Sequence, residues 1–530
     1  MTIQANIIMN EDTDNGGPVG NQNPYPMFAY KFEKIVLGGK KMFKRIKVFL
    51  AVALVVMMCL AGSLTAFADD PVINKDGAVI GTETSPVKVG ITKNLLMPIG
   101  TNVPNATFSF KATPITVDGI AYNKDLVAPN MPALNSTNLT IKYQTSPSIT
   151  YASETSGDVT TATIHTADIL AGVNFPHAGI YVYTITENNT GTNPGIEADI
   201  KHQTLTYSPA IYTLTIYVEN NAAGTGTYVA AVGDKITTAD NPDQEEGTKV
   251  DPSQGASKMV FTNTYIKING PADPEEPETP GTKPSTLLVS KTISATGLAD
   301  TTKYFEYTMT VQAPTMVYDP EDEKSTASAP IYNAYVVNKN GSVVSATDLA
   351  DAAKNNVSVT PKTDSYLNAY FEFVSGEENT FSLTDGQKLV FFSTPVGTSY
   401  GVTEAGYANY VADVKVTYAG DSVKVAYTEN AGKEAYINQP LNTDPSIPSN
   451  NPYFGLSSGV PASLKNLVGD SVGDSTNAAN SAKFTNTYFT ISPTGLIINV
   501  LPFVGLIILA GGALVAFIVV RSRKRIADSE

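Results

Sequence analysis

The pentapeptide Phe-Thr-Asn-Thr-Tyr occurs twice in this chain, at residues 261–265 and 484–488. An identical segment repeated at this distance indicates two copies of one structural unit. Two other patterns precede each pentapeptide in the same order: a strand-like segment with one central lysine, and a later segment that ends in Thr-Glu. The chain is therefore expected to fold into two related units, each closed by this pentapeptide.

Each of the two repeated units, called the first and second copy below, has three polar residues at similar spacings. They are Lys93, Glu187 and Asn263 in the first copy and Lys291, Glu404 and Asn486 in the second. Lysine and glutamate are 94 and 113 residues apart, and glutamate and asparagine are 76 and 82 residues apart. Lys88 and Glu83 are the nearest competing positions in the first copy, but they have no counterparts in the second. A single lysine in a strand is usually exposed to solvent and would indicate nothing by itself. The evidence for a site is that all three residues recur in the same order.

The pattern between these residues is typical of an all-β protein. Short runs rich in Val, Ile, Thr, Tyr and Phe alternate with clusters of Gly, Pro, Asn and Asp, as at 87–93, 106–112, 180–186 and 211–218. Such runs predict half-buried strands joined by turns. Helical periodicity is confined to residues 347–354. We therefore expect β-sandwiches.

A proline-rich stretch marks the boundary between the two units. Residues 269–284 contain five prolines and three glutamates, which favour an extended, semi-rigid spacer over a packed core. At roughly 100–200 residues per domain, the flanking segments are each large enough for one domain. We predict a first domain over residues 69–268, a linker over 269–284 and a second domain over 285–490.

The first 68 residues are expected to be a leader and a secretory signal peptide. Basic residues between 40 and 47 precede an apolar run from Val48 to Leu60, which leads to Ala-Phe-Ala before Asp69. This order of basic, apolar and small residues predicts cleavage between Ala68 and Asp69. A membrane anchor needs about 20 apolar residues, more than this run supplies. Translation starting at Met42 remains an alternative.

The C-terminal residues 491–530 resemble a cell-wall sorting signal of Gram-positive surface proteins. The expected sortase motif consists of Ile491, Ser492, Pro493, Thr494 and Gly495. An apolar stretch from Leu496 to Val520 follows, long enough to span a membrane, and then a basic tail that favours the cytoplasmic side. The common form of the signal is LPxTG, whereas here proline adjoins threonine, as in the xxPTG signals of pilin subunits. A plain stop-transfer anchor is the alternative.

Composition excludes several classes of function. The formal net charge of −15 gives no electrostatic footprint for nucleic acid. The single cysteine, Cys59, lies in the segment expected to be removed, so no disulfide, thiolate metal site or cysteine nucleophile is expected. The three histidines show no metal-binding spacing, and the sequence contains no Walker-type phosphate loop. We predict no metal, no cofactor and no turnover enzyme.

With these motifs, residues 86–525 as a whole resemble the streptococcal-type pilin isopeptide-linkage family. The most specific pieces are the segments around Lys93 and Glu187, the second-domain run 381–388, both Phe-Thr-Asn-Thr-Tyr closings and the Pro-Thr-Gly signal. The resemblance implies a two-domain backbone pilin with tandem immunoglobulin-like, Cna B-type β-sandwiches. It also implies a signal peptide before them and a transmembrane helix after them.

If the first and last strands of each sandwich are neighbours, the triplet can perform one chemical step. Lys93 and Asn263 would then point into the same core, with Glu187 between them. Burial lowers the pKa of a lysine and raises that of a glutamate. A neutral Lys93 amine is expected to attack the Asn263 carboxamide, while a protonated Glu187 hydrogen-bonds the amide oxygen and carries a proton to the leaving ammonia. The product is a Lys–Asn isopeptide bond, with Lys291, Glu404 and Asn486 expected to form the second.

The resemblance implies a secreted structural subunit of a pilus or wall fibre, anchored at the cell surface. Its expected partners are a sortase, neighbouring pilin subunits, peptidoglycan or cell wall, and a host surface ligand, but not nucleic acid. In such families the sortase joins the threonine of one subunit to a lysine of the next. Lys258 is the candidate for that lysine, with Lys249 and Lys235 as alternatives. The rival interpretation is a monomeric wall-anchored adhesin.

Overall fold

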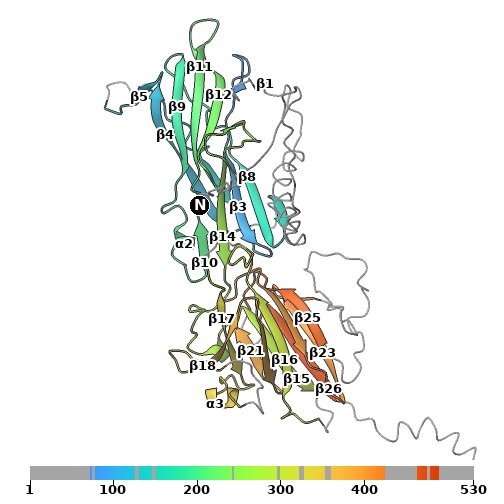
Figure 1. Ribbon diagram of the computed structural model, residues 1–530. Helices are drawn as coiled ribbons and strands as arrows, with labels where there is room; N and C mark the ends of the chain where they lie inside the picture. Colours follow the sequence, from blue (N-terminus) through green and yellow to red (C-terminus); the bar gives the residue numbers. More distant parts are fainter. Residues whose placement is uncertain are drawn as a thin grey trace, which may run out of the picture. The chain divides into compact units, whose positions relative to one another are not determined.

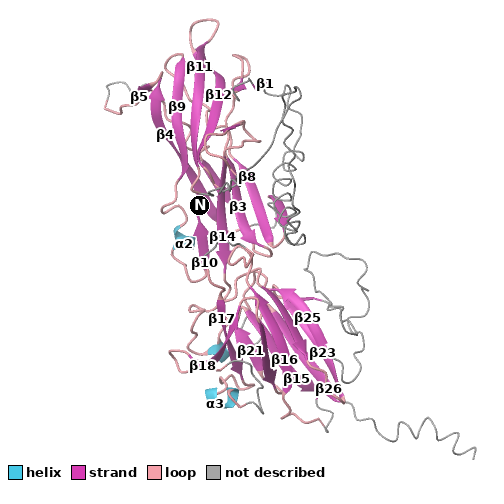
Figure 2. Cartoon of the chain, viewed as in Figure 1, coloured by secondary structure: helices cyan, strands magenta, loops and turns pink. Residues whose placement is uncertain are grey.

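In the computed structural model the chain is built almost entirely of strands (Figures 1 and 2). The described residues are 72–73, 78–125, 131–145, 151–240, 244–294, 299–321, 327–351, 360–423, 462–473 and 478–488. Their helices are short: α2 (Pro194–Glu197), α3 (Ala346–Leu349) and the 3-10 helix η1 (Pro280–Thr282). The predicted all-β sandwich class is confirmed.

Both predicted hydrophobic ends of the chain, residues 1–68 and 491–530, lie outside the described residues. Within the described ranges, no helix combines the length and the apolar character that a membrane crossing requires.

The first copy of the repeat forms two sheets. The larger has the order β1-β2-β12-β11-β9-β4-β5, with β13 beside β12 and β6 beside β4, and the smaller has the order β10-β14-β3-β8-β7. Their strands are β1 (Val72–Ile73), β2 (Val79–Ile80), β3 (Thr92–Pro98), β4 (Ala106–Val117), β5 (Ile120–Ala121), β6 (Thr140–Tyr143), β7 (Ala152–Ser156), β8 (Val159–His165), β9 (Gly179–Glu187), β10 (Gln203–Thr206), β11 (Ile211–Asn220), β12 (Thr227–Thr238), β13 (Lys249–Val250) and β14 (Val260–Lys267).

The second copy also forms two sheets. One has the order β18-β19-β17-β21-β15-β26-β23-β24, and the other has the order β20-β16-β22-β25. Their strands are β15 (Leu287–Ser294), β16 (Phe305–Gln312), β17 (Ile331–Val337), β18 (Lys362–Thr363), β19 (Ala369–Val374), β20 (Glu378–Leu383), β21 (Lys388–Phe391), β22 (Ser399–Glu404), β23 (Tyr410–Tyr418), β24 (Asp421–Val423), β25 (Ala462–Leu467) and β26 (Ser481–Tyr488).

The strand that carries the lysine and the strand that closes the copy are parallel neighbours in both copies. In the first, β3 pairs with β14, and in the second β15 pairs with β26. Parallel strands cannot be joined by a tight hairpin, so the rest of each copy must lie between them in sequence. The neighbourhood predicted for the lysine and the asparagine is therefore present twice.

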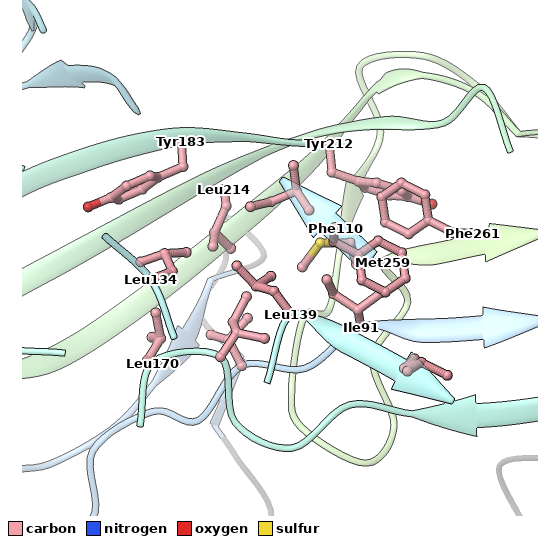
Figure 3. Close-up of a cluster of buried hydrophobic side chains, with 14 of the residues drawn as sticks. Ile91, Phe110, Leu134, Leu139, Leu170, Tyr183, Tyr212, Leu214, Met259 and Phe261 are labelled. Carbon is pink, nitrogen blue, oxygen red and sulfur yellow. The ribbon is translucent and has the colours of Figure 1, made fainter. Parts of the chain in front are cut away.

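Alternation of buried and half-buried residues, clearest in β14, builds the two cores. In β14, Phe261, Asn263 and Tyr265 are buried, while the threonines between them are only half-buried. Successive side chains of a strand point to opposite faces, so the pentapeptide places its asparagine between two aromatic rings on the core face. Figure 3 shows part of the first core, where Phe110 and Tyr212 lie against Phe261, with ring centroids 4.9 and 5.3 Å away.

One predicted strand begins later than its sequence suggests. The run 87–93 was expected to be a strand, but β3 starts at Thr92, and Val89 makes only an isolated bridge to Ser253. The amide of Val89 donates to the Asp168 carboxylate, and that of Ile91 donates to the Thr166 hydroxyl. Side-chain acceptors replace the strand partners at these positions, which interrupts the ladder.

The proline-rich segment, predicted as an extended, semi-rigid spacer, has buried prolines and contacts the second copy. Its prolines at 271, 274, 277 and 280 are buried. The carbonyl of Glu275 accepts hydrogen bonds from Asn333 at 3.3 Å and Tyr335 at 3.5 Å, both on β17. Asn368 donates to the carbonyls of Pro277 and Glu278, each at 3.3 Å. Side chains of the second copy thus bind backbone carbonyls of this segment; its role as a linker over 269–284 stays a prediction.

Candidate functional site

Lys93 and Asn263 face the same core from adjacent strands. In the register of β3 and β14, Lys93 lies opposite Phe261 and Asn263 lies opposite Leu95. An offset of two residues keeps both side chains on one face of the sheet. Both residues are fully buried. The alternation of each strand thus brings a lysine amine and an asparagine amide into one apolar layer.

Glu187 completes this site from the opposite sheet. It is the last residue of β9, where the alternating pattern of Tyr183, Ile185 and Glu187 points inward. The Lys93 Nζ lies 2.8 Å from Oε1 and 2.9 Å from Oε2 of this carboxylate. The Asn263 Nδ2 donates to Glu187 Oε1 at 3.0 Å. The structure therefore brings together all three residues of the first predicted triplet.

Burial changes the protonation of these groups. Removal from water lowers the pKa of Lys93 from 10.5 to about 8, although the neighbouring Glu187 opposes the shift. Burial also raises the pKa of Glu187 above its usual range, against the opposing effect of Lys93 and its hydrogen bonds. Because desolvation penalises both charged forms, the neutral amine becomes accessible near neutral pH.

The orientation of the Asn263 amide differs from the sequence-based expectation. Glu187 was expected to hydrogen-bond the amide oxygen, but it contacts the amide nitrogen. The oxygen, Oδ1, accepts from the backbone N–H of Ser208 at 2.7 Å. A backbone N–H can only donate, so it selects the oxygen and turns the nitrogen toward the carboxylate.

The second site repeats this arrangement with different surroundings. The Lys291 Nζ lies 2.8 Å from each oxygen of Glu404, and the Asn486 Nδ2 donates to Glu404 Oε1 at 2.6 Å. Lys291 and Asn486 come from β15 and β26 of one sheet, whereas Glu404 ends β22 of the other. Burial lowers the pKa of Lys291 to about 8, with Glu404 opposing the shift. Both predicted triplets are therefore assembled across a sandwich core.

Aromatic rings line the lysines in both sites. The Lys93 Nζ lies 4.8 Å from the ring centroid of Phe108, and the Lys291 Nζ lies 3.7 Å from that of Phe305. Aromatic faces stabilise a cation at this range, so the rings partly offset the loss of water around the amine. The two rings occupy corresponding places. In each copy the ring lies two residues before the residue that pairs with the glutamate on the neighbouring strand.

That partner residue distinguishes the two sites. Phe110 pairs with Glu187, whereas Tyr307 pairs with Glu404 and donates its hydroxyl to Glu404 Oε2 at 2.7 Å. Sequence reasoning did not find Tyr307, nor the Ser208 N–H of the first site. Every residue except proline carries a backbone N–H, so nothing in the sequence could have marked Ser208.

The candidate linkage lysines lie near the end of the first copy. Lys258 precedes β14, is partly exposed, and its backbone N–H donates to the Asp251 carbonyl at 2.6 Å. Lys249 on β13 and Lys235 on β12 are exposed and lie opposite each other in register. All three are outside the buried site. The cleavage residues Ala68 and Asp69 and the motif 491–495 lie outside the described residues.

Comparisons with known proteins find similarity in both copies. Residues 89–266 match a family model described as a Spy0128-like isopeptide containing domain. Residues 285–439 match a model described as a domain of unknown function, DUF7601. A curated pilin of Streptococcus pyogenes serotype M1 is 24% identical over 470 residues, which cover 86% of this chain and 96% of the relative. The chain is thus similar to a streptococcal pilin over most of its length.

Solved structures of pilins are also similar to this chain. A crystal structure of the major pilin from Streptococcus pyogenes shares 19% identity, covers 76% of this chain and 98% of the pilin, and has a TM-score of 0.24. The major pilin T-13 from Streptococcus pyogenes serotype GAS131465 shares 16% identity, covers 78% of this chain and 99% of the pilin, and also has a TM-score of 0.24.

Proposed function

We propose that this chain is a structural subunit of a pilus, held together internally by two Lys–Asn isopeptide bonds. The observation that carries the proposal is the same buried triplet in both copies, with the lysine 2.8 Å from its glutamate and the asparagine amide on that glutamate. The pilin relatives support the structural role. The bonds form once in each molecule, without a cofactor and without turnover.

The bond-forming step uses only groups of the site. The neutral Lys93 Nζ attacks Cγ of Asn263, and a new C–N bond forms as the bond to Nδ2 breaks. Glu187 contacts both nitrogens, so it takes a proton from Nζ and delivers it to Nδ2, which leaves as ammonia. Lys291, Glu404 and Asn486 act in the same way in the second copy.

The position of the bonds suits a protein that carries mechanical load. Each bond would join the lysine strand to the closing strand of the same copy, β3 to β14 and β15 to β26. Force applied at the two ends of a copy then passes through a covalent link instead of separating the strands of the sheet. With Cys59 as the single cysteine, the chain cannot form an internal disulfide for this purpose.

The subunit is proposed to act at the cell surface, as the pilin relatives suggest. A sortase would cut between Thr494 and Gly495 and join the threonine to a lysine of the next subunit or to the cell wall. Lys258 is the proposed acceptor, because it is partly exposed and lies outside the core.

The intact mass of recombinant residues 69–494 tests the internal bonds. Each bond releases one ammonia, so the mass is expected to lie about 34 Da below the sequence mass, about 17 Da for each bond. An Asn263→Ala variant should retain only the second loss of about 17 Da. A mass equal to that of the unmodified sequence would contradict the proposal.

A further inference from the structure

We propose that the backbone N–H of Ser208 is an oxyanion donor for the first isopeptide bond, and that Asp240 holds it in place. This inference rests on the proposed bond between Lys93 and Asn263 and adds two residues to its chemistry. Neither residue belongs to the repeated triplet.

The Ser208 N–H points at the atom that becomes negatively charged. It donates to Asn263 Oδ1 at 2.7 Å, and its second, longer contact is to Glu187 Oε2 at 3.3 Å. When the amine attacks Cγ, negative charge develops on Oδ1. A fixed donor at hydrogen-bond distance in a buried site stabilises that charge with little reorganisation. Ser208 is itself buried, so water does not compete for this position.

Asp240 ties the donor to the strand that carries the asparagine. One carboxylate oxygen accepts the Ser208 hydroxyl at 2.5 Å, and the other accepts the backbone N–H of Thr262 at 2.6 Å. Thr262 is the residue directly before Asn263. Asp240 therefore joins the segment between β10 and β11 to β14, and fixes the Ser208 N–H relative to the amide. It acts through Ser208, as a positioning residue.

The Ser208 hydroxyl also stabilises the turn that contains its own backbone N–H. It accepts the backbone N–H of Ala210 at 3.1 Å while it donates to Asp240. Such local side-chain hydrogen bonds hold a loop in one conformation. The donor is thus prepared before the reaction.

The second site lacks this donor. The Oδ1 atom of Asn486 is buried and has no hydrogen-bond partner among the described residues. Its glutamate instead receives a hydroxyl from Tyr307. The second bond therefore provides an internal control, because loss of the Asp240 contacts should affect only the first.

In chemical terms the N–H takes no part in the proton balance. The proton still moves from Lys93 Nζ through Glu187 to the leaving Nδ2, and the electron pair displaced onto Oδ1 returns to re-form the carbonyl as ammonia leaves. Ser208 only lowers the energy of the intermediate between these steps.

The test follows both bonds in the same molecules over time. The full chain is made by pulse-labelled cell-free translation with detergent, quenched in denaturant at intervals and digested. Mass spectrometry then measures the cross-linked peptides of Lys93 with Asn263 and of Lys291 with Asn486. Asp240→Ala removes both acceptors, and Asp240→Asn keeps one. Asp168→Ala is the matched control, since Asp168 also binds backbone N–H groups of the first copy but does not touch the triplet.

The expected result is a graded slowing of the first bond alone. Asp240→Ala should slow it by roughly 10- to 100-fold, because small displacements of a reacting group cost rates of this size. Asp240→Asn should have a rate between those of Asp240→Ala and the unmodified chain. Ser208→Pro, which removes the N–H itself, should slow it by roughly 100- to 1000-fold. The second bond and the Asp168→Ala chain should react at the original rate.

Two different failures can be told apart. If the unmodified chain never forms the Lys93–Asn263 link, the proposed function fails and this inference fails with it. If that link forms but Asp240→Ala leaves its rate unchanged, slows both bonds equally, or has no more effect than Asp168→Ala, the inference is overturned and the isopeptide bond stands.

Discussion

Lys93 and Glu187 come from opposite sheets of the first copy, and their charged groups lie 2.8 Å apart with neither side chain exposed to solvent. Burying an ion pair costs free energy, and an apolar pair of similar size is often as stable or more stable. The same arrangement recurs at Lys291 and Glu404, so a purely stabilising role explains it poorly. The asparagine amide that contacts each glutamate favours the proposed role in bond formation instead.

Removing one glutamate should abolish one bond only. Glu187→Ala should eliminate the Lys93–Asn263 link, because Glu187 contacts both reacting nitrogens, and Glu404→Ala should eliminate the Lys291–Asn486 link for the same reason. Peptide mapping of each variant measures both links, and each variant is the control for the other. Recovery of the first link in the Glu187→Ala chain would refute the role assigned to this residue.

Bond formation should speed up with rising pH and then level off. The attacking form is the neutral amine, and burial lowers the pKa of both site lysines to about 8. The neutral fraction therefore grows as pH rises toward about 8 and changes little above about 9. The initial rate in pulse-labelled translation products, transferred to buffers across this range, tests the prediction. A rate that still rises tenfold per pH unit above about 9 would indicate an ordinary lysine pKa.

Loss of the first bond should lower stability strongly. The link from Lys93 to Asn263 closes a long loop, and by analogy with disulfides its removal should reduce the free energy of unfolding by about 5 kcal/mol. Asn263→Ala removes it, and Thr264→Ala on the outer face of β14 is the control. Denaturant unfolding measures both. Equal midpoints for the two variants would show that the bond contributes little.

Polymerisation should depend on residues outside the cores. Thr494→Ala should leave both internal bonds intact but prevent cleavage at the sorting motif. Lys258→Ala should permit cleavage but stop chain growth, since a sortase thioester needs an accessible primary amine. Denaturing blots of wall extracts distinguish ladders from single bands.

Two results would revise that assignment. Ladders in the Lys258→Ala strain would shift the linkage to Lys249 or Lys235. A single band from the native protein would favour a monomeric adhesin.

The sequence determined which residues meet, because repetition and strand periodicity both act locally along the chain. The period of two puts Lys93, Glu187 and Asn263 on the core faces of their strands, and the second copy repeats the order. The repeated pentapeptide placed the closing strands. These signals need no knowledge of distant contacts.

Only the tertiary structure decided how the groups are oriented. The Asn263 oxygen faces Ser208 and its nitrogen faces Glu187, contrary to the expectation, because a loop distant in sequence supplies a backbone N–H. Asp240 and Tyr307 reach the sites through pairings between strands and loops that no local pattern encodes. Hydrogen-bond direction depends on which donor lies within about 3 Å, and only the folded chain fixes that distance.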